Sequence, residues 1–183
     1  MHKSGPHSSE QRDAVSEKSV DVAVMLEEWF LEHQEELLGT VYYLIGNLPD
    51  AQDAVQEAFV RSWNHRNQLP QVRDLKAWIY RITLNVARDI RKAAWNQRRK
   101  SFPDDLSSLA AKEKTPDEIV AEDEQIQLLR KWIAALEEPD KEVFLLRQNG
   151  DLTYPQIAEL LGIPEGTVKT RMRKAIEKMR NEK

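Results

Sequence analysis

The sequence contains no cysteine, only 6 glycines and 8 prolines in 183 residues, and no long apolar run. Without cysteine, a disulfide scaffold, a thiolate metal site and a cysteine nucleophile are excluded. No stretch approaches the roughly 18 apolar residues of a membrane-spanning helix, so we expect no direct membrane insertion. The polar N-terminus is not followed by the apolar core of a secretory signal, which favours a cytoplasmic protein.

Catalytic groupings are also missing from the sequence. The four histidines, His2, His7, His33 and His65, are scattered along the chain. No Ser/His/Asp set, glycine-rich phosphate loop or pair of metal-spaced ligands occurs. We therefore expect neither an enzyme nor a bound metal or other cofactor.

The residues that are present favour helices. Apolar side chains recur at spacings of three and four along residues 21–100 and again along 126–183, whereas no strand-like alternation of useful length occurs. Residues 101–125 are acidic and contain two prolines, which predicts a linker, and the polar residues 1–20 predict a disordered tail. The expected fold is all-α, with two small helical domains joined by the acidic linker. Each domain is small for an independent core, so we expect both to lean on a large partner.

Charge is clustered, although the formal net charge is only −4. Residues 70–100 carry nine Lys and Arg against two Asp and Glu, and residues 164–183 carry seven against three. Residues 101–128 reverse this balance, with eight acidic residues against two basic ones. A local basic block attracts a polyanion whatever the total charge, so an acidic protein can still bind DNA. A solvated surface explains either block alone equally well.

The C-terminal basic block follows a predicted helix-turn-helix. Thr153 and Gln156 fit a capping box, small Ala158 lets two helices approach, and Gly162 stands where the turn needs a positive φ. In such a motif the second helix enters the major groove of DNA. An ordinary amphipathic helix with a cationic outer face is the alternative, but the cap, the turn and the basic helix together favour DNA binding. The residues expected to face bases and phosphates are Thr167, Lys169, Thr170, Arg171, Arg173 and Lys174.

A polar stripe marks the helix predicted over residues 50–63, for which Asp50 is a candidate cap. Asp53, Gln56 and Glu57 lie at positions i, i+3 and i+4, opposite the apolar side. They are therefore free to meet a partner, although a solvated face explains the stripe equally well.

A second stripe marks the long helix that Asp74 is expected to cap. Cationic side chains can hold phosphates, and an asparagine has the donor and acceptor needed to read a base edge. Trp78 lies on the apolar seam and is expected in the core, whereas Tyr80 and Trp95 could pack there or stack on bases. The stripe falls at positions i, i+4, i+7 and i+11, and consists of Arg81, Asn85, Arg88 and Lys92.

Three motifs in this order resemble the extracytoplasmic-function sigma factors, the minimal two-domain members of the sigma-70 class of bacterial RNA polymerase sigma factors. The resemblance covers about residues 22–100 and 126–183. It departs from the family at Gln52 and Ala54, where Glu and a larger aliphatic residue are more common. The motifs read Asp50-Ala-Gln-Asp53-Ala-Val-Gln56-Glu57-Ala-Phe59, Trp78-Ile-Tyr80-Arg81-Ile-Thr-Leu-Asn85-Val-Ala-Arg88-Asp89 and Gly166-Thr-Val-Lys-Thr-Arg171.

The resemblance implies a factor that directs promoter-specific transcription initiation. Its partners would be core RNA polymerase, promoter DNA and an anti-sigma factor. Residues 21–100 would bind core polymerase and the −10 element, with the loop 68–74 forming a pocket for an unstacked base. Residues 126–183 would read the −35 element, and the acidic linker would follow a positively charged polymerase channel. The residues implied for core binding are Asp50, Asp53, Gln56 and Glu57, and those for the −10 element are Arg81, Asn85, Arg88 and Lys92.

Two other functions remain open from the residues alone. A stand-alone helix-turn-helix regulator would bind a palindromic duplex as a dimer, without polymerase. A helical protein-interaction adaptor would show no salt-sensitive affinity for DNA.

Overall fold

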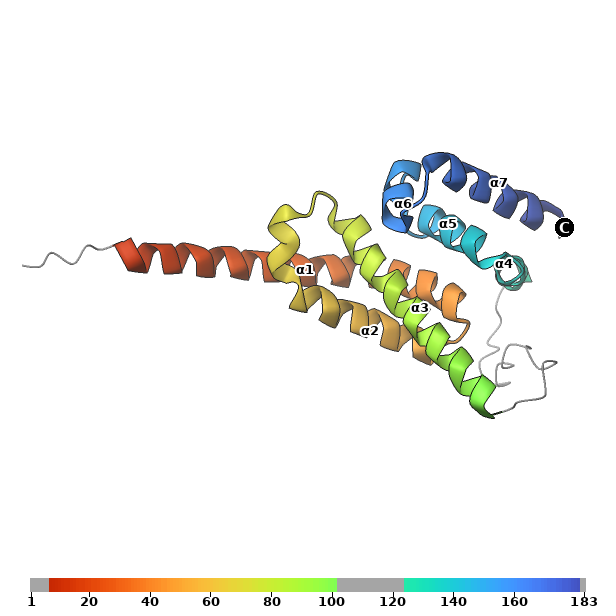
Figure 1. Cartoon of the computed structure of the whole chain (residues 1–183), viewed down its shortest axis with the longest axis horizontal. Helices are drawn as coiled ribbons and strands as arrows, with labels where there is room; N and C mark the ends of the chain where they lie inside the picture. Colours follow the sequence, from red (N-terminus) through yellow and green to blue (C-terminus); the bar gives the residue numbers. More distant parts are fainter. Residues whose placement is uncertain (1–6, 102–123, 182–183) are drawn as a thin grey trace, which may run out of the picture.

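The computed structural model describes residues 7–101 and 124–181, which form seven α-helices and one short 3₁₀ helix without a strand (Figure 1). The all-α prediction is therefore confirmed for these residues, while residues 102–123 of the predicted linker lie outside them. In chain order the elements are α1 (His7–Ile45), α2 (Leu48–Asn64), η1 (Arg66–Gln71), α3 (Leu75–Ser101), α4 (Glu124–Ala134), α5 (Glu138–Gln148), α6 (Tyr154–Leu161) and α7 (Glu165–Asn181).

Helices α1, α2 and α3 pack together around an apolar core. Small side chains let α2 approach its neighbours, because Ala51, Ala54 and Ala58 are fully buried. Phe30 of α1 meets Phe59 of α2 edge to face, with 5.1 Å between ring centroids. The apolar periodicity of these segments thus forms the buried faces that it predicts.

The start of α2 differs from the prediction. Its cap is Asn47, whose side-chain oxygen accepts a hydrogen bond from the backbone N–H of Asp50 at 2.9 Å. Asp50, the predicted cap, therefore lies inside the first turn. Pro49 fits beside it because a first-turn residue needs no N–H donor.

Two segments predicted as irregular are also partly helical. The expected disordered tail, residues 1–20, differs because α1 begins at His7: no proline or glycine interrupts the next 31 residues, and a helix propagates easily once started. The predicted loop 68–74 begins inside η1. Leu69 is buried there, and its carbonyl accepts a hydrogen bond from the N–H of Val72 at 3.0 Å.

Helices α5, α6 and α7 contain the predicted helix-turn-helix. The capping box is confirmed, because the side-chain oxygen of Gln156 accepts a hydrogen bond from the N–H of Thr153 at 2.7 Å. The turn glycine is confirmed as well, since Gly162 has φ 67° in the left-handed region. Helix α7 begins at Glu165, two residues before the predicted Thr167.

The two helical groups pack against each other, since α3 contacts α6 and α1 contacts α5 (Figure 1). Tyr80 of α3 is fully buried in this junction. The turn after α5 comes so close that a Cβ added to Gly150 would lie 3.1 Å from the Tyr80 ring and 2.7 Å from the Leu146 carbonyl oxygen. Each small half is therefore stabilised by packing against the other half, whereas the sequence predicted stabilisation only by an external partner.

Gly162→Ala should destabilise the fold by about 1 kcal/mol, because a Cβ is unfavourable in the left-handed region. Nothing lies within 4 Å of the added atom, so the cost is conformational rather than steric. Gly166→Ala is the matched control: it lies inside α7, is equally open, and should stabilise by about 0.5 kcal/mol. Urea unfolding measures both variants, and effects of the same sign would contradict the argument.

Burial raises the pKa of Tyr80 above its ordinary value, and its hydroxyl lacks a hydrogen-bond partner among the described residues. The unfolded chain therefore loses the Tyr80 proton at a lower pH than the folded chain. The free energy of unfolding keeps its full value below the ordinary tyrosine pKa of about 10, and it falls as the pH rises above that value. We expect Tyr80→Phe to reduce the fall in unfolding free energy between about pH 8 and about pH 11. Urea titrations at both pH values test this, and an identical fall in both proteins would refute it.

Candidate functional site

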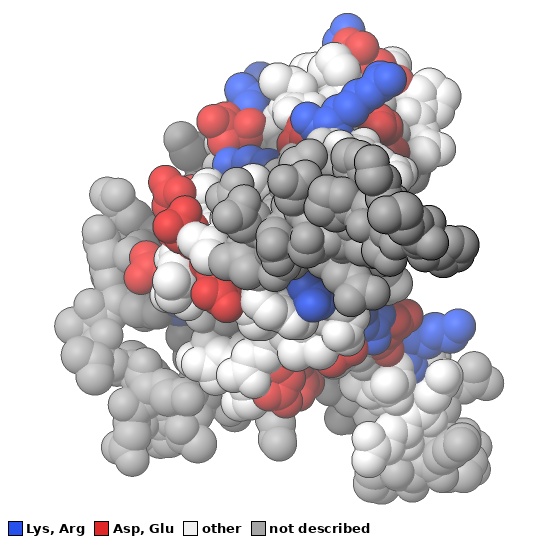
Figure 2. Space-filling model, turned by 90° about the vertical axis from the view of Figure 1, so that its left-hand side faces the viewer, with Lys and Arg blue, Asp and Glu red and all other residues white. Residues whose placement is uncertain are grey.

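The outer face of α7 carries the residues predicted for duplex DNA. Arg171 is half-buried and Lys174 exposed, and neither has an ion pair among the described residues. Lys169 lies 2.7 Å from the carboxylate of Glu165, and this hydrogen bond raises its pKa. In Figure 2, blue side chains gather on the upper part of the molecule, where α6 and α7 lie, with red ones between them. The other predicted residues on this face are half-buried Thr167 and exposed Thr170 and Arg173.

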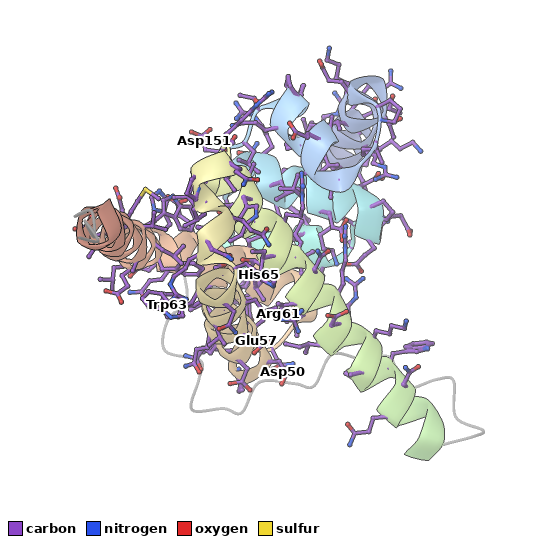
Figure 3. The ribbon with its side chains drawn as sticks, turned by 60° about the vertical axis from the view of Figure 1, so that its left-hand side comes forward. Asp50, Glu57, Arg61, Trp63, His65 and Asp151 are labelled. Atoms are coloured by element: carbon purple, nitrogen blue, oxygen red, sulfur yellow. The ribbon has the colours of Figure 1, made fainter. Side chains whose placement is uncertain are left out.

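In the polar stripe on α2, Asp53, Gln56 and Glu57 are exposed, and Figure 3 shows Glu57 with its neighbours on the helix, Asp50 and Arg61. Asp53 and Gln56 have no hydrogen bond or ion pair within the described part of the chain. Glu57 is already engaged, because its carboxylate accepts a hydrogen bond from Arg61 at 2.7 Å, and this bond raises the pKa of Arg61. Asp50 is half-buried at the start of the helix. The stripe therefore offers unpaired acceptors mainly at Asp53 and Gln56.

An apolar hollow continues this stripe and was missed by the sequence analysis. It has a volume of about 170 Å³ and is lined by Glu27, Phe59, Val60 and Trp63. Val60 is 49% exposed and lies seven positions after Asp53, hence on the same face of α2. Extending the stripe by one more helical period would have identified it.

The second stripe follows the outer side of α3, but its members differ in their surroundings. Asn85 and Lys92 are exposed and have no partner among the described residues. Arg81 donates a hydrogen bond to the Glu159 carbonyl of α6 at 3.3 Å. Arg88 is half-buried by the C-terminal helices. The structure thus places all four residues along one helix, with two of them in contact with the other half.

The loop before α3 forms a hollow of about 320 Å³ where the family resemblance implies a pocket, and α6 forms part of its wall. Trp78 lines this hollow, and it is half-buried and packs against the core, as predicted. Tyr80 is fully buried and so cannot stack on a base, whereas Trp95 is 45% exposed. The hollow is lined by Gln71, Val72, Arg73, Asp74, Ala77, Trp78, Arg81, Gln156 and Glu159.

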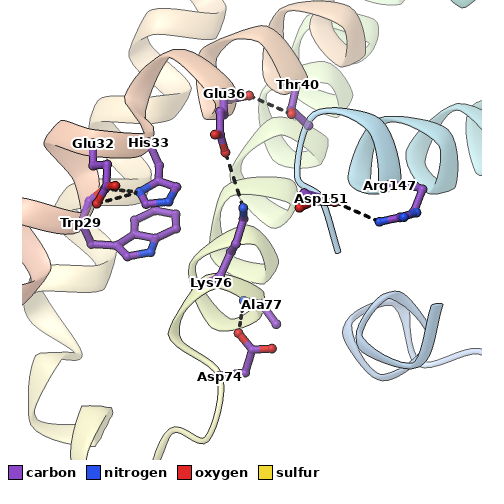
Figure 4. Close-up of polar contacts among 10 residues, drawn as sticks. All are labelled: Trp29, Glu32, His33, Glu36, Thr40, Asp74, Lys76, Ala77, Arg147 and Asp151. Atoms are coloured by element: carbon purple, nitrogen blue, oxygen red, sulfur yellow. Dashed lines mark hydrogen bonds and ion pairs between the residues drawn. The ribbon is translucent and has the colours of Figure 1, made fainter. Parts of the chain in front are cut away.

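Asp74 joins the two halves at this hollow. One oxygen caps α3 by accepting the Ala77 N–H at 2.9 Å, as predicted (Figure 4). The other oxygen accepts a hydrogen bond from the side chain of Gln156, the residue that closes the capping box of α6. Nearby, Lys76 of α3 lies 3.6 Å from Glu36 of α1. The N-termini of α3 and α6 are therefore held together by side chains that cap them.

Within the ranges 7–101 and 124–181, no group of three or more side chains is placed to hold a metal ion. The helices in the same ranges include none with the length and apolar character needed to cross a membrane.

Two family patterns match the chain. The first contains the polar stripes of α2 and α3, and the second contains the exposed face of α7. Residues 29–97, which contain the stripes of α2 and α3, match sigma-70 region 2. Residues 126–179, which contain the exposed face of α7, match sigma-70 region 4. The ECF RNA polymerase sigma factor SigW of Bacillus subtilis is 27% identical over 164 residues, covering 82% of this chain and 84% of its own. The ECF sigma factor SigL of Mycobacterium tuberculosis is 29% identical over 167 residues, covering 91% and 93%.

Two solved structures share the fold. The sigma factor RpoE, in complex with the anti-sigma factor NepR from Bartonella quintana, superposes with a TM-score of 0.66 at 20% identity, covering 85% of this chain and 94% of that one. CnrH, in complex with the cytosolic domain of CnrY, gives a TM-score of 0.65 at 18% identity, covering 89% and 92%.

Two sigma-70 regions in this order, and relatives named as sigma factors along most of the chain, support an initiation factor over a stand-alone regulator. The chain therefore belongs to the sigma-70 family, as an extracytoplasmic-function RNA polymerase sigma factor.

Proposed function

We propose that the two helical groups divide the work of promoter recognition. Residues 21–100 form the domain that binds core RNA polymerase and the −10 element, and residues 126–183 form the domain that reads the −35 element. The observation that supports this division is the position of three polar stripes, on α2, α3 and α7, within the matched sigma-70 regions.

Core polymerase binds the exposed stripe of α2, through Asp50, Asp53, Gln56 and Glu57. In the family this helix meets the clamp-helix coiled coil of the polymerase. Unpaired acceptors at Asp53 and Gln56 suit a partner rich in donors, and the hollow beside Val60 suits an apolar side chain from the same partner. Glu57 contributes mainly by fixing Arg61, which also reaches Asp89 of α3 at 3.4 Å.

The −10 element is read by α3 and the hollow at its N-terminus. Asn85 is exposed and can present both a donor and an acceptor to a base edge. Arg81, Arg88 and Lys92 hold phosphates, and the hollow of about 320 Å³ can receive an unstacked base.

The −35 element is read as duplex by the N-terminal half of α7. Arg171 and Lys174 have no competing ion pair with any residue that the structure describes, which makes them the strongest candidates for bases and phosphates. Thr167, Lys169, Thr170 and Arg173 lie around them. No catalytic step belongs to the chain, because binding and DNA opening account for the whole role.

Further proposals concern the linker, the partners and the cell compartment. The acidic residues 101–125 follow a positively charged polymerase channel, where they mimic nucleic acid. An anti-sigma factor holds this chain inactive, by analogy with the NepR complex of the RpoE relative. The protein acts in the cytoplasm, where core polymerase and promoters are found.

Run-off transcription with purified core polymerase tests the proposed function. Adding the protein to genomic fragments should produce new transcripts from a small set of start sites. The same start sites with core polymerase alone, or binding of the free protein to a symmetric operator, would contradict it.

Asp53→Lys should weaken binding to core polymerase by about tenfold or more, because it places a like charge against a donor-rich partner. Asp53 is preferable to Glu57 because changing Glu57 also disturbs Arg61. Glu32→Lys is the matched control, since it makes the same charge change at a side chain of α1 that is 77% exposed. Fluorescence anisotropy with labelled protein measures both affinities, and equal losses would refute the interface.

Asn85→Ala and Arg171→Ala should each reduce a different step of initiation by about tenfold, since each removes a base contact. Asn85→Ala should reduce strand opening, seen by permanganate reactivity of the −10 region. Arg171→Ala should remove the dependence of transcription on the −35 sequence while sparing opening. Arg180→Ala, exposed near the end of α7, is the control and should change neither. A single shared defect would overturn the division of labour.

A further inference from the structure

The C-terminal part of α3 extends beyond the other helices (Figure 1). Ile90 is the last large apolar residue of α3 that packs against the core. From Lys92 to Gln97 every side chain is exposed except half-buried Ala94. This part of the helix nevertheless carries a tryptophan, Trp95, which is 45% exposed. The sequence left open whether Trp95 packs in the core or meets nucleic acid, and its exposure excludes the core.

The charges around Trp95 indicate the chemistry of its partner. Residues 91–100 contain five Lys and Arg and no Asp or Glu. Arg91 is paired with Glu138 of α5, whereas Lys92 has no ion pair among the described residues. The helix dipole favours cations at this end of α3, which explains the charge but not an exposed tryptophan. Cations and an exposed aromatic ring together suit nucleic acid, because the cations hold phosphates and the ring packs on a sugar or a base.

Trp95 lies on the same face of α3 as the stripe proposed for the −10 element. It follows Asn85 by ten positions and Lys92 by three, so the three residues lie within roughly 80° of one another around the helix. A rise of about 1.5 Å per residue places Trp95 roughly 15 Å from Asn85 along the helix axis. This separation equals the length of about four base pairs. A duplex that continues along α3 from Asn85 therefore reaches Trp95.

The two ends of α3 face DNA in different states under the proposed function, on which this inference rests. The hollow at the N-terminus of α3 receives an unstacked base, so this end meets the opened strand. The −35 element is read as duplex by α7, so the spacer between the two elements stays paired. Because the opened strand lies at the N-terminal end of α3, the paired spacer lies toward its C-terminal end.

We propose that Trp95 forms a further DNA contact, which holds the paired spacer directly upstream of the −10 element. Because the bases of the spacer are paired and stacked, the indole ring packs on the sugar–phosphate backbone, and its N–H donates to a phosphate. Lys92 holds a phosphate between this contact and Asn85. A backbone contact carries no sequence information, so it strengthens binding to a promoter whatever the sequence of its spacer.

Two probes from a promoter found by run-off transcription measure this contact in the complex of the protein with core polymerase. Both carry the −10 element with its strands unpaired and lack the −35 element. The longer probe adds the paired spacer, and the shorter one ends at the upstream edge of the −10 element. Trp95→Ala should weaken binding to the longer probe about fivefold and leave the shorter one unaffected.

Two further variants sharpen this measurement. Trp95→Tyr keeps an aromatic ring and a donor, and should retain most of the affinity for the longer probe. Gln97→Ala is the matched control, because it lies exposed on the opposite side of α3 and should change neither affinity. Since Trp95 carries no charge, the dependence of affinity on salt should keep the same slope in Trp95→Ala.

The position of the contact on the DNA can be mapped because the chain lacks cysteine. Asn96→Cys, exposed beside Trp95, provides a single attachment site for an iron–EDTA reagent before the protein meets core polymerase. Hydroxyl radicals from the reagent should cut the paired DNA just upstream of the −10 element. Cuts confined to the opened −10 region, or no cuts in the promoter, would overturn the proposal.

The outcomes separate this inference from the proposed function. Core-dependent transcription together with unchanged or tighter binding of Trp95→Ala to the longer probe would overturn the inference alone. An equal loss on both probes, or an equal loss in Gln97→Ala, would do the same. If the wild-type protein starts no core-dependent transcript, the proposed function fails, and this inference fails with it.

Discussion

Glu142 holds a carboxylate in a place where only 9% of its side chain is exposed, and the arrangement of the two halves depends on how that charge is neutralised. Removing an ion from water costs several kcal/mol unless a partner with good geometry compensates it. Among the described residues the partner is Arg88, and it comes from the other half of the molecule. Its two directed hydrogen bonds fix the position of α5 relative to α3.

The middle of α5 is buried on all sides. Five consecutive residues, from Glu142 to Leu146, are buried, although a helix packed on one face would bury only every third or fourth. Helices α6 and α7 cover part of α5, and α1 lies against another part. Since a helix surrounded in this way has no solvated side for Glu142, the arginine of α3 completes its environment. Closure and the ion pair are thus two aspects of one packing arrangement.

Local features could be predicted from the sequence because they depend on residues a few positions apart. The capping box of α6, the left-handed Gly162 and the Asp74 cap are of this kind. The cap of α2 was wrong by three residues because Asn47 and Asp50 are both good caps, and only the fold selects one. The junction between the halves could not be predicted, since Glu138 and Glu142 resemble any solvated acidic pair until Arg91 and Arg88 are placed beside them. One signal was present: the apolar run Val143–Leu146 is too continuous for a helix with a single buried face.

The three stripes differ in how exposed they are in the closed chain. Under the proposed function, this difference determines which contacts with polymerase and DNA can form first. The α2 and α7 faces are open, so contacts with polymerase and with the −35 duplex can form on the closed chain. On α3, Asn85 and Lys92 are exposed as well, whereas Arg88 is held by Glu142 until the halves separate. A ligand shifts such an equilibrium only by binding one state more tightly than the other. Polymerase and promoter therefore favour opening to the extent that they hold α2 and α7 at a separation the closed chain cannot reach. With the proposed −10 role, Arg88 would exchange the Glu142 carboxylate for a phosphate, so that its charge stays paired in both states.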